Sequence, residues 1–269
     1  MTPPVALTIA GSDSGGAAGV QADLKTFAAL GVFGTCAVTA LTAQNSTAVV
    51  AISPVDADFV VAQIDAVLSD LPVVAVKTGL LATAEIVDAV AEHAAAGRLP
   101  NLVVDPVMVA SSGARLLDID AERTYRDQLV PYAAVLTPNR REASVLLGRT
   151  VHTLDDQRDA ARALHAAGAE TVVVTGGDAP DNTDEAVDVA CSADGLVELR
   201  SSRIPTVNTH GSGCSFASAV AAGLARGQPV SAALRDAKSF VHAAIETAAC
   251  WHLGSGHGPL NHFQWEPQP

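Results

Sequence analysis

Basic residues are scarce in this sequence. Its 269 residues include 16 lysines and arginines against 29 aspartates and glutamates, which gives a formal net charge of −13. Binding to nucleic acid or to an anionic membrane needs clustered Lys and Arg, so the charge balance argues against both as main partners. Any chemistry on phosphate groups must therefore rely on a few placed cations, on helix dipoles and on metal ions.

Cysteines and long apolar runs are also rare. The four cysteines, Cys36, Cys191, Cys214 and Cys250, have neither the density of a disulfide scaffold nor the spacing of a zinc site. No apolar run approaches the length of a membrane span, and no basic segment precedes the short apolar run near the N-terminus. We expect a cytoplasmic protein that works in a reducing compartment.

Hydrophobic residues make up 49% of the chain, enough for a large buried core. Short β-branched runs, typical of buried strands, alternate with longer Ala-rich segments of helical character. The expected strands are 5–10, 35–43, 73–77, 102–104, 134–136 and 171–175, with an antiparallel pair at 186–191 and 196–200. The expected helices are 20–30, 56–69, 84–96, 121–130, 141–147, 155–167, 214–225 and 231–251. This order predicts an α/β fold, a mainly parallel sheet with helices on both faces, in one domain over residues 1–269.

Polar residues and glycines collect where the expected strands end. They are Gly11–Gly19, Gln44-Asn45, Lys77–Gly79, Asp105-Pro106, Asn139, Thr175–Gly177 and the turn at Gly211. Each of them alone is explained by turn or capping chemistry. In sheets of this kind, however, ligands bind beyond the carboxyl ends of the strands. The repetition of such endings therefore predicts a binding site at that edge.

The stretch from Asn208 to Ser215 reads Asn-Thr-His-Gly-Ser-Gly-Cys-Ser and precedes an apolar, Ala-rich segment. Two glycines before a helix let the backbone turn tightly and aim free N–H groups at one point, which suits an anion such as phosphate. The helix N-terminus would also lower the pKa of the Cys214 thiol, so Cys214 is a candidate general base. Taken alone, the stretch is explained equally well as a Gly-rich loop capped by Ser212 or Ser215.

Several long blocks of the sequence are specific enough to carry a family resemblance. They are Ala10–Gly16, Gly19–Phe27, Thr39–Asn45, Asp105–Ala110, Leu136–Asn139, Asn208–Cys214 and Gly256–Phe263. Over nearly its whole length the chain resembles the hydroxymethylpyrimidine/phosphomethylpyrimidine kinases of thiamine biosynthesis, a branch of the ribokinase-like superfamily. The resemblance implies a three-layer α/β/α fold with a mainly parallel central sheet, ATP and Mg²⁺ as cofactors, a small-molecule pyrimidine substrate and a homodimer. It also implies γ-phosphoryl transfer to 4-amino-5-hydroxymethyl-2-methylpyrimidine and then to its monophosphate.

On the substrate side, the residues that match the family are Gly11, Asp23, Gln44, Leu80 and Val107. Gln44 has an amide that can accept from an exocyclic amine and donate to the neighbouring ring nitrogen, which suits the edge of an aminopyrimidine. For Asp23 the alternative is an acidic residue in the first turn of a helix, where the helix dipole favours it. Leu80 stands where the family often has Met, a change that conserves volume.

On the nucleotide side, the resemblance assigns Asp105, Asn139, Glu142 and Thr175, with Asp105 and Glu142 at the magnesium ion. The Asn-x-x-Glu spacing places Asn139 at a helix start and Glu142 one turn further on, so a capping box is the alternative explanation. A capping pair can still hold Mg²⁺ through water, because that ion keeps several of its waters.

The catalytic set implied by the resemblance is Gly211, Gly213, Cys214 and Lys238. Cys214 stands where ribokinase-like sugar kinases commonly have an Asp, and a thiol is the weaker base. Phosphoryl transfer depends largely on positioning and charge stabilisation, so a modest base is tolerable. For Lys238 the alternative is a solvated position on a helix face.

Some features of the sequence depart from the family pattern. Thr175 and Asp178 stand where the family more often has Lys and His, so one cation near the nucleotide phosphates is missing, and Ala17 replaces a frequent Gly. Other functions therefore stay open. They are a pyridoxal or other vitamin kinase of the same superfamily, a thiol enzyme that uses Cys214 with His210, and a non-catalytic ligand sensor.

Overall fold

The computed structural model describes residues 2–108, 119–177 and 184–263. Within them the strands are β1 (Val5–Asp13), β2 (Phe33–Gln44), β3 (Val49–Pro54), β4 (Val73–Thr78), β5 (Leu102–Val104), β6 (Val135–Leu136), β7 (Val172–Val174), β8 (Glu185–Ser192) and β9 (Gly195–Ser202). The helices are α1 (Gly19–Ala29), α2 (Ala57–Asp70), α3 (Ala84–Ala95), α4 (Ile119–Thr124), α5 (Arg140–Leu147), α6 (Leu154–Ala166), α7 (Ser212–Ala225) and α8 (Val230–Ala248). Asp178 lies outside the described residues.

The strands form one nine-stranded sheet in the order β3-β2-β1-β4-β5-β6-β7-β8-β9. The central strands from β2 to β7 in this order pair in parallel. Antiparallel strands flank them: β3 pairs with β2 on one side, and β8 and β9 follow β7 on the other. The predicted mainly parallel sheet is therefore confirmed, and so is the antiparallel pair near its end.

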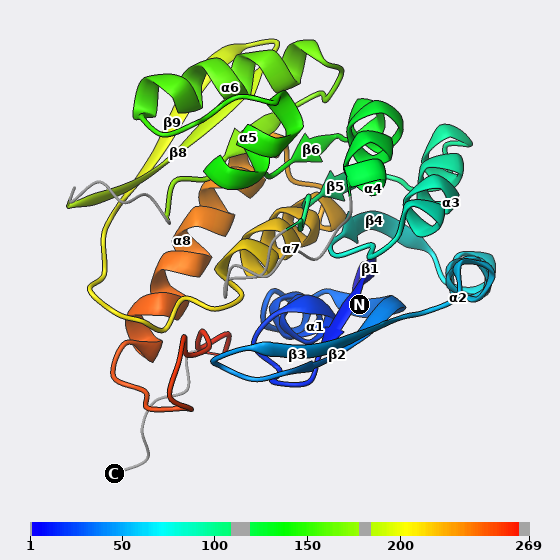
Figure 1. The fold of residues 1–269 in the computed structure, drawn as a ribbon, viewed down its shortest axis with the longest axis horizontal. Helices are drawn as coiled ribbons and strands as arrows, with labels where there is room; N and C mark the ends of the chain where they lie inside the picture. Colours follow the sequence, from blue (N-terminus) through cyan, green and yellow to red (C-terminus); the bar gives the residue numbers. More distant parts are fainter. Residues whose placement is uncertain (1, 109–118, 178–183, 264–269) are drawn as a thin grey trace.

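Helices cover both faces of the sheet, and each face has its own apolar core. Helices α2, α3, α5 and α6 pack on one face, where Ile64, Ile86 and Leu164 are buried. On the other face, α1 and α7 lie against the sheet and α8 packs on α7, as Figure 1 shows. Successive side chains of a strand point to opposite faces, so Ala6 belongs to one core and Leu7 to the other. The three-layer α/β/α fold is thus confirmed. No helix in the described part of the chain is long and apolar enough to cross a membrane.

Some element boundaries differ from the sequence prediction. The first strand continues to Asp13, three residues beyond its expected end at Ala10. Strand β3, which the sequence prediction lacks, lies at the exposed edge of the sheet, and its residues are half-buried or exposed. The expected helix 121–130 becomes α4, a π-helical turn at Tyr125–Leu129 and a 3-10 turn at Val130–Tyr132. Pro131 in the last turn has no N–H to continue an α-helical pattern.

The segment after α8 returns to the start of α7. The backbone N–H of His257 donates to the Ser46 carbonyl at 3.0 Å, and that of His210 donates to the Gly258 carbonyl at 3.0 Å. At its end, His262 Nε2 lies 2.8 Å from the Ser215 hydroxyl in the first turn of α7. In Figure 1 this segment, drawn in red, lies beside the β2–β3 hairpin. This segment, the turn at Ser46 and the start of α7 are far apart in the sequence and are therefore held together in the fold.

His262 predicts a pH-dependent loss of stability. Its side chain is buried, and burial, helped by the charge of Lys25, lowers its pKa from 6.5 to about 4. Because the unfolded chain takes up this proton first, the stabilising contribution is complete above pH 6.5 and is lost as the pH falls towards 4. At roughly 1.4 kcal/mol per pKa unit, we expect a loss of roughly 3 kcal/mol from this residue.

The measurement is the free energy of unfolding from urea titrations at pH 7, 6, 5 and 4. His262→Gln, which keeps a polar partner for Ser215, should have a flatter profile than the wild type over this range. Parallel profiles for the two proteins would show that the wild-type loss comes from other groups.

Candidate functional site

The carboxyl ends of the parallel strands bring the predicted site residues to one edge of the sheet. Asp105 directly follows β5, and its N–H donates to the carbonyl of Thr78, the last residue of β4. Asn139 and Thr175, which follow β6 and β7, form a parallel bridge to each other. The first loop and the turn at Gly211 reach the same edge from β1 and α7. The clustering predicted from the strand endings is what the structure shows.

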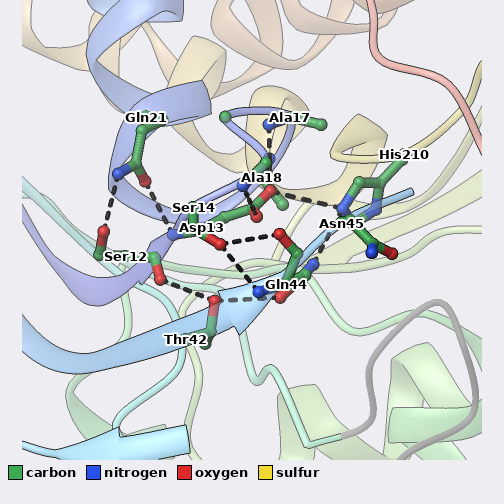
Figure 2. A network of polar contacts seen from close by, with 12 residues as sticks. Ser12, Asp13, Ser14, Ala17, Ala18, Gln21, Thr42, Gln44, Asn45 and His210 are labelled. Atoms are coloured by element: carbon green, nitrogen blue, oxygen red, sulfur yellow. Dashed lines mark hydrogen bonds and ion pairs between the residues drawn. The ribbon is translucent and has the colours of Figure 1, made fainter. Parts of the chain in front are cut away.

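The first glycine-rich loop is organised by Asp13, a residue that the sequence prediction did not single out. Its carboxylate accepts from the backbone N–H groups of Gly15 at 2.7 Å, Ala17 at 3.0 Å and Ala18 at 2.8 Å. Burial raises the pKa of Asp13, but hydrogen bonds from His210 and from these amides outweigh it, so the pKa is lowered. The loop therefore wraps an ionised carboxylate, as Figure 2 shows.

Gln44 ends β2 beside this loop. Its backbone N–H donates to the Ser14 hydroxyl at 2.8 Å, and the same hydroxyl donates to the Gln44 carbonyl at 2.7 Å. In the side chain, one end of the amide lies 3.0 Å from His210 Nε2, and the other end lies 3.3 Å from the Thr42 hydroxyl, which itself donates to the Ser12 carbonyl at 3.0 Å. Both the backbone and the amide of Gln44 are thus held in place at the edge where the first loop and the turn before α7 meet (Figure 2).

The turn before α7 has the geometry expected of an anion site. Gly211 has φ +88°, and a Cβ there would lie 1.9 Å from the Ala17 carbonyl oxygen, so no other residue fits. Gly211 is also the N-cap of α7, which begins at Ser212 without a side-chain cap. Ser215 contacts His262 instead of capping the helix. The explanation of this stretch as a loop capped by Ser212 or Ser215 is therefore wrong. Gly213 in the first turn is exposed, and no atom of the described residues lies within 4 Å of the position that a Cβ would take.

A buried ionic cluster lies beneath this turn. Lys77 Nζ is 3.1 Å from Asp23 Oδ1 and 3.4 Å from Asp105 Oδ2, and Lys77 and Asp23 are fully buried. Burial lowers the pKa of Lys77, but the surrounding groups, Asp23 foremost, outweigh this and raise it. Lys77 therefore stays charged. A lysine at the end of a buried strand is visible in the sequence, but its partners are not.

Asp23 makes several contacts inside the protein. Its oxygens accept from the Thr8 hydroxyl at 2.6 Å and the Ser218 hydroxyl at 2.7 Å, in addition to Lys77. Asp23 has no exposed surface, so its contacts in this structure are structural ones, and a contact with substrate stays a prediction. The alternative, an acidic residue in the first turn of a helix that is favoured by the helix dipole, does not apply to Asp23. Helix α1 begins at Gly19 and has no acidic residue in its first turn.

Cys214 lies half-buried next to this cluster. Burial raises the pKa of its thiol to about 12, although the charge of Lys77 acts in the opposite direction. The prediction that the helix N-terminus would lower this pKa is therefore wrong, because desolvation outweighs the helix dipole. Nor does the structure support a thiol enzyme, since His210 Nε2 faces Gln44 and Asp13.

The raised pKa predicts slow alkylation of Cys214. Iodoacetamide reacts with the thiolate, so at pH 7 we expect Cys214 to react at least about 100-fold more slowly than the exposed Cys250. Peptide mapping by mass spectrometry after timed exposure gives both rates in one sample. Labelling of Cys214 ahead of Cys250 would restore an activated thiol and a base role.

The nucleotide side of the site follows β6 and β7. Asn139 and Glu142 form the capping box of α5: the Asn139 side chain accepts from the Glu142 N–H, and Glu142 Oε2 accepts from the Asn139 N–H at 2.9 Å. The Thr175 N–H donates to the Pro138 carbonyl at 2.8 Å. Lys238 on α8 is 2.7 Å from Asp188, and Asp188 also accepts from the N–H of Gly176, the residue after Thr175. Lys238 is thus connected through Asp188 to the loop at Thr175 and does not lie on a solvated helix face.

The remaining predicted substrate residues lie between β1, β4 and β5. Leu80 is 8% exposed, and a Cβ at Gly11 would lie 3.1 Å from its Cδ2. The Leu80 carbonyl accepts from the Thr39 hydroxyl. Val107 is half-buried, and its N–H donates to the carbonyl of Asp105. Gly11 and Leu80 are thus in contact, and Val107 follows the buried carboxylate of Asp105.

A glycine turn on a helix start, set at the carboxyl edge of an α/β/α sheet, is the arrangement of a ribokinase-like small-molecule kinase. Comparison with known proteins gives the particular family. The family model described as phosphomethylpyrimidine kinase matches residues 13–261. The chain belongs to the hydroxymethylpyrimidine/phosphomethylpyrimidine kinase family, and it is a phosphotransferase.

Individual relatives agree with this assignment. The chain is 47% identical to the hydroxymethylpyrimidine/phosphomethylpyrimidine kinase of Rhizobium meliloti over 263 residues, which are 96% of this chain and 97% of the relative. An ADP complex of Bacillus subtilis pyridoxal kinase superposes with a TM-score of 0.89 at 41% identity and covers 97% of this chain and 98% of the other. For the phosphomethylpyrimidine kinase of Clostridium difficile, the TM-score is 0.79 at 35% identity, with 90% and 99% covered. The predicted family, fold class and type of reaction are confirmed.

Proposed function

We propose that this protein transfers the γ-phosphoryl group of ATP to 4-amino-5-hydroxymethyl-2-methylpyrimidine and then to the resulting monophosphate. The observation that carries the proposal is the position of Gln44, whose amide is held beside the anion turn by His210 and Thr42. That amide has a donor and an acceptor side by side, as the edge of an aminopyrimidine requires. Gly11, Leu80 and Val107 would surround the ring.

The phosphoryl group would bind at the turn formed by Gly211 and Gly213. No side chain of the described residues caps α7, and the Ser212 N–H donates to the Thr209 carbonyl, so the N–H groups of Gly213 and Cys214 would face the anion together with the positive end of the dipole. Cys214 would act by position, since a thiol with a raised pKa stays protonated at pH 7 and cannot take up the proton of the alcohol. In the second step the attacking oxygen belongs to a phosphate that is already anionic, so no base is needed.

On the nucleotide side, Thr175, Asn139 and Lys238 would contact ATP. Lys238 is paired with Asp188, so its charge is partly compensated before a nucleotide binds. Position 175 is a Thr and carries no charge either, so few cations are available for the ATP phosphates. Most of their charge must then be met by helix N-termini and a metal ion.

The chain also offers residues that suit Mg²⁺. Asp105 is buried, and its Oδ2 makes no hydrogen bond within the described residues, although Lys77 Nζ lies 3.4 Å away. Glu142 is buried in the capping box of α5, with one oxygen on the Asn139 N–H. Carboxylate oxygens with several retained waters are the ligands that Mg²⁺ prefers. When bound, the ion would neutralise charge on the ATP phosphates, and Asp105 and Glu142 would hold it, directly or through water.

Replacement of Glu142 by Gln tests this metal assignment. The Gln side chain can still accept from the Asn139 N–H, but it has no charge. The Mg²⁺ concentration for half-maximal activity should therefore rise by roughly tenfold, and the preference among substrates should not change. The measurement is a Mg²⁺ titration at fixed ATP. Asp156→Asn, in the capping box of α6, is the matched control. An equal shift in both variants, or none in Glu142→Gln, would leave Glu142 a capping residue only.

The direct test of the proposed function is ADP release with hydroxymethylpyrimidine, its monophosphate and pyridoxal. We expect turnover of both pyrimidines and a kcat/KM for pyridoxal at least about tenfold lower. The likeness to the B. subtilis pyridoxal kinase makes a pyridoxal kinase the second candidate. Preference for pyridoxal would select it, and no turnover of any of the three would favour a ligand sensor. The same proposal includes a homodimer in the cytoplasm. Light scattering of the purified protein tests whether it is a dimer.

A further inference from the structure

His210 contacts two groups on the substrate side of the site, a position from which it can affect the choice of substrate. Its ring nitrogen Nε2 lies 3.0 Å from Gln44 Nε2 and 3.5 Å from Asp13 Oδ2. His210 is 8% exposed and Asp13 is 3% exposed. In Figure 2 the imidazole lies between the carboxylate of the first loop and the end of β2.

The position of this imidazole is fixed from several sides. The backbone N–H of His210 donates to the Gly258 carbonyl at 3.0 Å, and the next residue, Gly211, packs against the Ala17 carbonyl. Asp13 is itself held by three backbone N–H groups of the first loop. The ring therefore cannot move away from Gln44 unless both glycine-rich segments move.

Hydrogen-bond chemistry then relates the ring to the orientation of the Gln44 amide. The Asp13 carboxylate only accepts, so the ring proton that faces it is on His210 Nε2, and the Gln44 amide must turn its oxygen to this N–H. The Thr42 hydroxyl donates its proton to the Ser12 carbonyl at 3.0 Å, so its oxygen accepts from the amide N–H of Gln44 on the other side. An amide has two N–H groups and two lone pairs on its oxygen, so these contacts leave one donor and one acceptor for a ligand.

The opposite orientation of the amide would present these two groups in reverse order. It would also place the amide N–H groups of Gln44 against the N–H of His210 Nε2, which is unfavourable. An aminopyrimidine edge needs an acceptor for its amine and a donor for its ring nitrogen, in one order only. The orientation enforced by His210 thus decides whether both hydrogen bonds form.

We propose that His210 is a positioning residue that orients the Gln44 amide for an aminopyrimidine edge and thereby sets the preference for hydroxymethylpyrimidine over pyridoxal. This inference rests on the proposed function. Asp13 accepts from the N–H at Nε2, so it keeps the ring proton on the nitrogen that faces Gln44.

A double-mutant cycle with Gln44 tests the inference. His210→Leu should raise the KM for hydroxymethylpyrimidine by roughly tenfold or more, with kcat and the KM for pyridoxal changed by less than about threefold. If His210 acts through Gln44, the same substitution in Gln44→Leu should change kcat/KM for hydroxymethylpyrimidine by less than about twofold. His210→Gln places an amide donor near the position of Nε2 and should keep the KM within about threefold of the wild type. His252→Leu, at an exposed histidine of the C-terminal segment, is the control and should change neither substrate.

The outcomes separate the inference from the function on which it rests. Equal losses with both substrates in His210→Leu, or losses that add fully to those of Gln44→Leu, overturn the role of His210 while the wild type still phosphorylates the pyrimidine. A wild type without activity on hydroxymethylpyrimidine overturns the proposed function and this inference with it. If His210→Leu shows no cooperative thermal unfolding, His210→Asn replaces it. The shorter Asn side chain does not reach Gln44, so the same rise in the KM for hydroxymethylpyrimidine is expected. An unchanged KM overturns the inference.

Discussion

Replacing Lys77 by Met is expected to lower the free energy of unfolding by roughly 3–5 kcal/mol. Met has a similar length but no charge, so Asp23 and Asp105 would be left buried beside each other without a cation. Both lie within 3.4 Å of Lys77 Nζ, and Lys77 and Asp23 have no exposed surface. An uncompensated carboxylate in such surroundings takes up a proton or admits water, and either costs stability.

The comparison that isolates the charge effect is the double variant Lys77→Met with Asp23→Asn. It removes one carboxylate together with the lysine, so we expect it to recover part of the loss, about 1–2 kcal/mol. Lys25→Met is the matched control, because Lys25 is half-buried and donates to the Gly16 carbonyl rather than to a buried acid. Urea unfolding gives all four values. A loss in Lys77→Met no larger than in Lys25→Met would contradict the importance of the buried cluster.

Gln44→Leu is expected to lower kcat/KM for hydroxymethylpyrimidine by an amount equivalent to roughly 2–4 kcal/mol. Leu has a similar size but neither donor nor acceptor, so the substrate loses two hydrogen bonds and its own edge groups are left unpaired. Pyridoxal lacks the aminopyrimidine edge, so it should lose far less. The preference between the two substrates should therefore fall along with the activity.

Both substrates are to be measured with both proteins at fixed ATP and Mg²⁺. Gln63→Leu is a useful control, because Gln63 also pairs twice with β2, at the backbone of Val38, but lies on α2. It should reduce stability without changing the preference. If Gln44→Leu depresses the two substrates equally, Gln44 is a structural residue at the end of a strand, and the pyrimidine assignment loses its main physical support.

Local signals were sufficient to predict most of the fold and the edge of the sheet where the site lies. Apolar runs such as Val172–Val174 and capping signals such as Asn139 with Glu142 act over a few residues, and both appear in the structure as expected. Strand β3 was not predicted, because its residues pair only with β2 at an exposed edge and bury little apolar surface.

The site residues that escaped prediction depend on long-range contacts. The partners of Lys77 lie on α1 and after β5, and the residue that faces Gln44 Nε2 is 166 positions away in the sequence. The direction of the pKa shift at Cys214 was wrong for the same reason: the helix N-terminus is visible in the sequence, whereas the desolvation that outweighs it is not. Asp13 had a local signal, an acidic residue before Ser-Gly-Gly, which is typical of a loop that folds around a carboxylate.

The contacts of the C-terminal segment have a consequence for the order of events during synthesis. His210 is held by the Gly258 carbonyl, and the β2–β3 turn at Ser46 is held by the His257 amide. A ribosome-bound chain can therefore form β1, β2 and α1 early. The hydrogen bonds that hold His210 and the β2–β3 turn cannot form until residues near 258 have left the exit tunnel. Catalytic competence should then appear later than the assembly of the sheet itself, once the residues near 258 can dock.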